Sequence, residues 1–295
     1  MKVILRPGPH GWRGLAGAVL VAWLLGGGCP WARAEAPFPA LYPDVELFAR
    51  ALAKATQPPL AQRITGLTVP HHLLAIDLLA GAFARLRDKD YRRIVILCPD
   101  HYTRSITPFA VAGRDFATSL GPVATDTEAV AALLACPLVT ASNLFSQEHG
   151  IHALTPFLAH FFPRARLVAV AIRKTATPAQ WDRLAEVLAP LLDDTTLLVQ
   201  STDFSHYLTP GEAARKDQET LRRLADPDPA GLVGLDQPRH VDCRAALYLQ
   251  RSLQQTVYRA TPTTVANRNS QAYTRTPVRR STSYMVQYYS PDPVL

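Results

Sequence analysis

Two short apolar runs rich in β-branched residues, at 64–69 and 93–98, each stop just before a histidine, and this pattern constrains the fold most. Runs of this length and composition predict buried strands, and residues 73–87 between them have helical periodicity. Strand, helix and strand predict an adjacent parallel pair whose carboxyl ends lie on one rim of an open α/β sheet. We therefore expect His71 and His101 to lie side by side on that rim, which suggests a metal site.

Helical and strand-like segments continue to alternate along the rest of the chain. This alternation predicts an α/β fold with a mostly parallel or mixed central sheet flanked by helices. Residues 35–295 suffice for a single domain with a sizeable core, and we expect one domain there. The expected helices are 45–54, 127–134, 179–192, 211–224 and 245–253; the expected strands are 167–172, 197–200, 257–266 and 283–289, with a hairpin-like region at 109–125.

Further candidate site residues follow the later segments. Asp203 and His206 come after the strand-like run 196–199, so we expect them past a strand end as well. Cys243 follows Asp242 at the start of an expected helix, where a thiol is a candidate thiolate. The alternative for Cys243 is a small buried apolar residue, and the alternative for Asp203 and His206 is a turn with a hydrogen-bonded histidine.

Five motifs occur in the order and spacing found in the Memo family, also called AmmeMemoRadiSam system protein B. They are VPHH at 69–72, ILCPDHY at 96–102, EHGIHALTPFL at 148–158, STDFSHYL at 201–208 and STSYMVQYY at 281–289. The chain from residue 64 to 289 thus resembles this family, whose fold is similar to that of class III extradiol ring-cleaving dioxygenases. Five ordered motifs are a more specific signal than any one of them.

The resemblance implies a metal site made of two histidines and a cysteine. Carried over by motif, the metal ligands are His71, His101 and Cys243. The family's cysteine is usually followed by glycine, whereas Arg244 follows here, so Asp242 stays open as a carboxylate alternative. The implied cofactor is a divalent metal ion, with iron preferred and copper or zinc as alternatives.

The family also has an aspartate and a histidine close to the metal, which correspond to Asp203 and His206. We expect these two residues to be catalytic without holding the metal by themselves. In this interpretation His206 moves protons, and a hydrogen bond that Asp203 accepts from its ring orients the ring and raises its basicity. The roles of His72, His149 and His152 stay open.

These features predict a metal-dependent redox or dioxygenase-like enzyme whose substrate the sequence does not identify. One alternative is a non-enzymatic protein that binds a peptide or small anion in the same cleft. Another is a metal-dependent hydrolase, for which zinc would activate water and no thiolate would be needed. The oligomeric state is equally open.

The first residues predict export. A basic start, a short apolar stretch at 15–25 and Ala32-Arg33-Ala34 are typical of a secretory signal peptide over 1–34, and the apolar part is too short for a transmembrane span. We expect cleavage before Glu35 and a periplasmic or secreted protein. Lipidation at Cys29 is the alternative, which we disfavour because Gly26 stands where such sites usually carry a large aliphatic residue.

The formal net charge is +7, and several arginines gather near residues 275–280. These clusters lack interleaved aromatic residues and no helix carries a basic stripe, so we expect no nucleic-acid partner. The arginines are typical of a solvated surface or of attraction for an anionic substrate. Cleavage would leave Cys98, Cys136 and Cys243, and this odd number predicts at least one free thiol.

Overall fold

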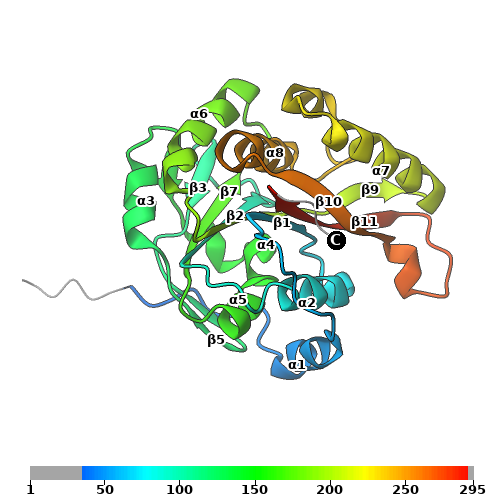
Figure 1. The fold of residues 1–295 in the computed structure, drawn as a ribbon, viewed down its shortest axis with the longest axis horizontal. Coiled ribbons are helices and arrows are strands. Elements are labelled where there is room, and N and C mark those ends of the chain that lie inside the picture. Colours follow the sequence, from blue (N-terminus) through cyan, green and yellow to red (C-terminus); the bar gives the residue numbers. More distant parts are fainter. Residues whose placement is uncertain (1–34, 292–295) are drawn as a thin grey trace, which may run out of the picture. The chain divides into compact units, whose positions relative to one another are not determined.

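A mixed sheet with a parallel centre organises the chain, of which the computed structural model describes residues 35–291. Within that range nine strands join in one sheet, and the four central ones, β1, β8, β2 and β7, run parallel (Figure 1). Antiparallel strands flank this centre on both sides. In spatial order the strands are β10 (Thr261–Asn269), β11 (Ser281–Ser290), β1 (Gly66–Val69), β8 (Thr196–Ser201), β2 (Arg93–Pro99), β7 (Arg166–Ile172), β3 (Phe109–Val111) and β6 (Val139–Ala141), while β9 (Phe204–Leu208) pairs with β11.

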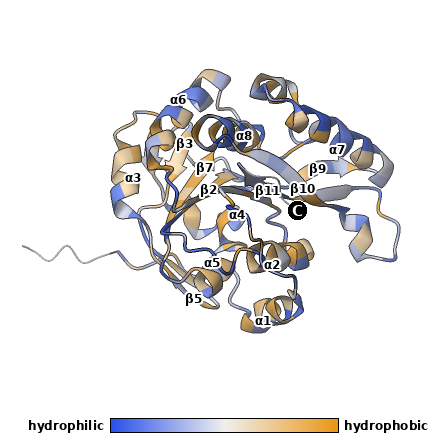
Figure 2. Cartoon of the chain, viewed as in Figure 1, coloured by the Kyte–Doolittle hydropathy of each residue, from blue (hydrophilic) through white to orange (hydrophobic). Residues whose placement is uncertain are grey.

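Helices cover both faces of the sheet, as alternation along β2 requires. Ile94 and Ile96 pack in one apolar cluster, whereas Val95 and Leu97 pack in another on the opposite face. The first face is covered by α1 (Val45–Lys54), α2 (Ile76–Ala84) and α5 (Thr155–Phe161), and the second by α3 (Thr127–Leu134), α6 (Pro178–Leu188) and α8 (Arg244–Tyr258). Figure 2 shows the apolar central strands between these layers.

Two further helices and a small hairpin lie outside these layers. Helix α7 (Pro210–Ala225) contacts β9 and has a capping box of Thr209 and Glu212 with proline at its first position, a strong helix start. The short helix α4 (His149–His152) precedes α5. Strands β4 (Phe116–Thr118) and β5 (Gly121–Val123) form a separate hairpin, which confirms part of the hairpin-like region expected from the sequence.

The α/β class and the flanked mixed sheet are confirmed, but several local predictions were wrong. Strands β1 and β2 are parallel yet not adjacent, because β8 lies between them. The strand expected at 257–266 begins late, because α8 continues to Tyr258 and β10 starts at Thr261. Strand β9 was not expected at all.

The predictions for the first residues lie outside the described part of the chain. They include the signal peptide at 1–34, its cleavage site and the alternative of lipidation at Cys29. Between residues 35 and 291, no helix has both the length and the apolar character needed to cross a membrane.

Candidate metal centre

His71 and His101 meet at the carboxyl ends of the parallel strands. His71 follows β1 and is buried, and His101 follows β2 and is partly buried. Their ring centroids lie 4.7 Å apart with the planes nearly perpendicular. The intervening strand β8 ends at Ser201, whose hydroxyl lies 3.2 Å from His71 Nδ1. The expected pairing on one rim is therefore confirmed, although β8 separates the two parent strands.

A third imidazole, from His149 in α4, completes the cluster. Its centroid lies 3.9 Å from that of His101 and 5.1 Å from that of His71. One potential ligand atom from each of the three histidines lies within 4.8 Å of the others, so the group could hold a metal ion. The sequence interpretation left His149 without a role. The sequence Glu148-His149 could have indicated this position, because a carboxylate at the start of a short helix can cap it and so hold the next residue in place.

Hydrogen bonds on the far side of two rings set their tautomers. The Ser201 hydroxyl donates to the Gly150 carbonyl at 2.5 Å, so toward His71 it can only accept, and Nδ1 of His71 carries the proton. His101 Nδ1 lies 2.6 Å from Glu148 Oε1, and this carboxylate oxygen accepts a hydrogen bond from the Nδ1–H of His101. Both Nε2 atoms are then free to act as donors of a lone pair to a cation.

Glu148 is a fully buried carboxylate that organises the His101 side of the cluster. Besides the ring of His101, it accepts hydrogen bonds from the backbone N–H of His101 at 3.1 Å and of Gly150 at 2.9 Å. Burial acts to raise the pKa of Glu148, but the hydrogen bond and charge of His101 outweigh it and hold the pKa below its usual range. Glu148 therefore stays ionised beside the imidazoles.

Asp242 supplies a second buried carboxylate, from the loop that leads into α8. Its Oδ2 lies 3.1 Å from His71 Nε2 and 3.7 Å from His101 Nε2, and it accepts the backbone N–H of Asp203 at 3.2 Å. Its other oxygen, Oδ1, has no hydrogen-bond partner among the described residues. Burial opposes ionisation, but the charge of His71 and the hydrogen bonds from His101 and His71 keep the pKa of Asp242 well below its usual value.

The electrostatics make this a site that favours positive charge. Burial alone would lower the pKa of His71, yet the charges of Asp203 and Asp242 raise it to about 9. Burial and the charges of His71 and His101 lower the pKa of His149 to about 3, so this ring is neutral at pH 7. Against the effect of burial, hydrogen bonds with Asp242 and Glu148 also raise the pKa of His101. The carboxylates thus favour positive charge at the cluster, either as protons on His71 and His101 or as a bound metal ion.

Asp203 and His206 lie beside this cluster but not in the predicted arrangement. Asp203 Oδ1 accepts the backbone N–H of His71 at 3.1 Å, and its Oδ2 lies 3.9 Å from His71 Nε2. The expected hydrogen bond between His206 and Asp203 was wrong, because both Asp203 oxygens face His71 and Nδ1 of His206 has no partner among the described residues. Burial is the main cause that lowers, rather than raises, the pKa of His206. The catalytic roles of both residues stay predictions.

Cys243 lies next to the cluster along the chain but belongs to an apolar environment. It precedes α8 and packs in the buried cluster that also contains Val95 and Leu249. It is absent from the group of close ligand atoms found among the described residues. Burial, reinforced by the charge of Asp242, raises the pKa of its thiol. Cys98, Cys136 and Cys243 are all free and buried, and a metal role for Cys243 stays a prediction.

The other two histidines with open roles form hydrogen bonds elsewhere. His72 Nδ1 lies 2.7 Å from the hydroxyl of Tyr284, and the two rings stack. His152 Nε2 lies 2.7 Å from the carbonyl oxygen of Phe145. Both contacts are typical of histidines that connect neighbouring segments.

The donor set fits a metal ion. Imidazole and carboxylate donors together are typical of iron, zinc and copper sites in proteins. The Oδ1 atom of Asp242 is buried without a hydrogen-bond donor among the described residues, as expected for an oxygen that faces a cation. Glu148 and Ser201 provide the outer hydrogen bonds that usually orient metal-binding histidines.

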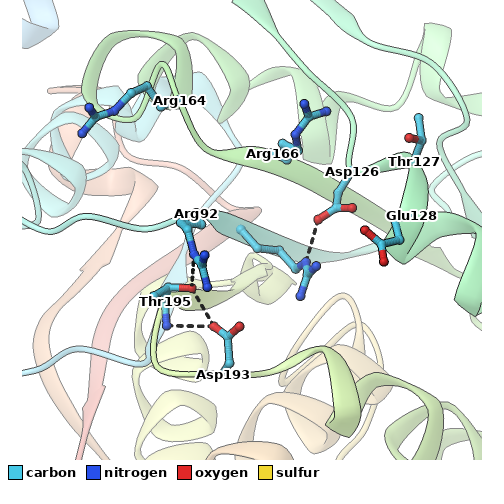
Figure 3. Close-up of a pocket in the computed structure, with 9 residues that line it drawn as sticks. Arg92, Asp126, Thr127, Glu128, Arg164, Arg166, Asp193 and Thr195 are labelled. Atoms are coloured by element: carbon cyan, nitrogen blue, oxygen red, sulfur yellow. Dashed lines mark hydrogen bonds and ion pairs between the residues drawn. The ribbon is translucent and has the colours of Figure 1, made fainter.

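A charged cavity of about 610 Å³ lies at the opposite ends of the parallel strands, away from the histidines (Figure 3). Arg93 at the start of β2 forms an ion pair with Asp126 at 2.7 Å, and Arg92 donates to Thr195 at 3.1 Å. Arg164 and Arg166 also line this cavity. Because charged pairs partly occupy its wall and it is far along the strands from the imidazoles, it is not part of the candidate metal centre.

Comparison with known proteins relates most of the chain to one family. The chain is 30% identical to a MEMO1 family protein of Methanopyrus kandleri over 145 residues, which cover 48% of this chain and 51% of that protein. It is 28% identical to a MEMO1 family protein of Aquifex aeolicus over 148 residues, which cover 48% and 39% of the two chains. The matched stretch thus spans about half or less of these relatives.

One solved structure, an uncharacterised protein from Escherichia coli K12, superimposes with a TM-score of 0.48 and 14% identity, covering 76% of this chain and 99% of that one. The family model described as Memo-like protein matches residues 42–241, which contain the three clustered histidines and most of the parallel sheet. The chain therefore belongs to the Memo-like protein family.

Proposed function

We propose that this protein is a metal-dependent oxidoreductase, similar to a dioxygenase, that binds one divalent metal ion through His71 and His101. The observation that carries the proposal is the convergence of His71, His101 and His149 at the carboxyl ends of the parallel strands, where α/β folds bind ligands. A bound iron ion would supply redox chemistry and open coordination positions for an oxygen-containing substrate. The reaction type rests on the likeness in fold and rim, so the substrate is left open.

The surrounding side chains have distinct tasks in this proposal. The neutral ring of His206, with a free Nδ1, accepts a proton from a substrate bound at the rim. Asp203 holds the backbone of His71 in place through the hydrogen bond to its N–H. Glu148 keeps His101 in the tautomer whose Nε2 is unprotonated.

The proposal is tested with protein loaded separately with Fe(II), Cu(II) and Zn(II). We expect one tightly bound Fe(II) per chain, lost in His71→Ala and in His101→Ala but retained in His160→Ala, an exposed histidine of α5. Nitric oxide, a stand-in for dioxygen, should bind the Fe(II) form and give a paramagnetic iron–nitrosyl spectrum. Full metal occupancy in both rim variants would place the site elsewhere. Binding of Zn(II) alone, with no nitrosyl species, would favour a hydrolase instead.

A further inference from the structure

We propose that the carboxylate of Asp242, rather than the thiol of Cys243, is the third protein ligand of this metal site. The inference rests on the proposed metal site and specifies its chemistry. It makes the ligand set two imidazoles and one carboxylate, with no sulfur. Three lines of observation support it: the distances at Asp242, its unpartnered oxygen and the surroundings of Cys243.

The first line is the spacing of the potential ligand atoms. Metal bonds to nitrogen and oxygen are about 2.1 Å long, so two ligands at the angles of tetrahedral or octahedral sites lie about 3.0 to 3.4 Å apart. Asp242 Oδ2 lies 3.1 Å from His71 Nε2 and 3.7 Å from His101 Nε2. A carboxylate at these separations needs a shift of only a few tenths of an ångström to bind the same ion as both rings.

The second line is how firmly Asp242 is held and what its side chain lacks. The backbone N–H of Asp242 donates to the Asp203 carbonyl at 3.0 Å, and Asp242 Oδ2 accepts the backbone N–H of Asp203 at 3.2 Å. These reciprocal bonds fix the carboxylate at the rim. Its other oxygen, Oδ1, is buried without a partner among the described residues, which is costly unless a water or the same cation, bound through both carboxylate oxygens, satisfies it.

The third line is the different surroundings of the next residue. Cys243 is 1% exposed and packs with apolar side chains such as Val95 and Leu249. In that environment a thiol is stable as a small apolar group, and its ionised form is disfavoured.

An all-nitrogen-and-oxygen set changes which metals the site prefers. Thiolate ligands select soft ions such as Cu(I), whereas two histidines and one carboxylate with open positions are typical of non-haem Fe(II) centres. His149 is the competing third ligand, because the group of close ligand atoms contains His71, His101 and His149 but not Asp242. The test therefore includes the His149→Ala variant.

The test measures Co(II) binding by equilibrium dialysis and by visible and near-ultraviolet spectroscopy of the full-length protein. We expect a cobalt spectrum without a sulfur-to-metal charge-transfer band, unchanged in Cys243→Ala. Asp242→Asn should weaken binding by at least about 100-fold, and Asp242→Glu should recover part of it. Cys243→Ala should keep affinity within about threefold, which makes it the matched control for the neighbouring position.

Three results would overturn the assignment. They are a charge-transfer band that disappears in Cys243→Ala, full affinity in Asp242→Asn, and a loss in His149→Ala that Asp242→Asn does not show. If Asp242→Asn does not fold, the wild-type and Cys243→Ala spectra still show whether sulfur binds the metal, and the affinities of Asp242→Glu and His149→Ala decide between the carboxylate and the third imidazole. Failure of the broader proposal looks different, because wild type would then bind no cobalt or His71→Ala would bind it normally.

Discussion

Burial and the neighbouring charges together determine the protonation of the clustered histidines. A buried imidazole is stable in the protonated form only where a carboxylate compensates the charge, as Asp242 does for His71 at 3.1 Å. His149 lies in the same cluster, but its pKa falls to about 3 because burial and its two histidine neighbours dominate. The neighbouring rings of His71 and His149 therefore differ in charge at neutral pH.

A similar pair outside the metal centre gives a prediction about acid stability. Glu219 of α7 lies 3.0 Å from His240 Nε2, and this close contact, with a hydrogen bond from Lys216, lowers the pKa of Glu219 to about 2. Because the pKa is depressed in the folded state, the pair adds stability above about pH 4.5, and this contribution is lost as the pH falls toward 2. Glu219→Gln should therefore lower the free energy of unfolding at pH 6 and have a progressively smaller effect in acid.

The measurement is urea unfolding between pH 6 and pH 2.5. Glu186→Gln is the control, because Glu186 forms an exposed ion pair with Arg183 one turn away, and exposed pairs of this kind contribute little. If wild type and Glu219→Gln differed in free energy of unfolding by the same amount at every pH, the ionised carboxylate of Glu219 would not be the source of this stability.

At the level of elements, the sequence predicted best where local signals decide the structure. Helices α1 and α3 have the expected bounds, because Asp44 and Asp126 cap helices with clear apolar periodicity. The position of β8 between β1 and β2 could not be predicted, since strand order depends on contacts far apart in sequence. For the same reason His149 was not assigned, because only the folded chain brings α4 to the ends of β1 and β2.

The contact between α8 and β1 yields a prediction at this scale. Gly66 lies in β1, and a Cβ built there would come within 2.5 Å of Gln250 Nε2 and even closer to Gln254. Gln254 is not free to move, because it accepts from the Thr65 hydroxyl at 2.6 Å and donates to the Thr65 carbonyl at 3.0 Å. Gly66→Ala should therefore lower the free energy of unfolding by about 1–3 kcal/mol through overpacking.

Urea denaturation measures this cost, and Gly211→Ala in α7 is the control. Nothing lies within 4 Å of a Cβ built at Gly211, so alanine there should leave stability unchanged or raise it by up to about 1 kcal/mol through helix propensity. If Gly66→Ala were as stable as wild type, the close approach of α8 to β1 would not be tight in solution.

At the scale of the described domain, the candidate metal site joins segments that are distant in sequence. His71, His101, His149 and Asp242 come from the ends of β1 and β2, from α4 and from the loop before α8. Helices cover both faces of the sheet (Figure 1). The site lies at the rim formed by the carboxyl ends of its parallel strands. An ion held there binds only the folded arrangement, because the unfolded chain does not bring these side chains together.

Metal binding should therefore stabilise the whole fold. With free metal at about 100 times its dissociation constant, the folded state gains about 2.7 kcal/mol. In a domain of this size that corresponds to a rise of about 5–10 °C in the midpoint of thermal unfolding. Scanning calorimetry with Fe(II) under anaerobic conditions should show this rise for wild type and for His160→Ala but not for His71→Ala, since only the last variant loses a rim imidazole. An equal rise of the midpoint in all three proteins would mean that the ion binds outside the rim. Binding at the rim would then not stabilise the fold.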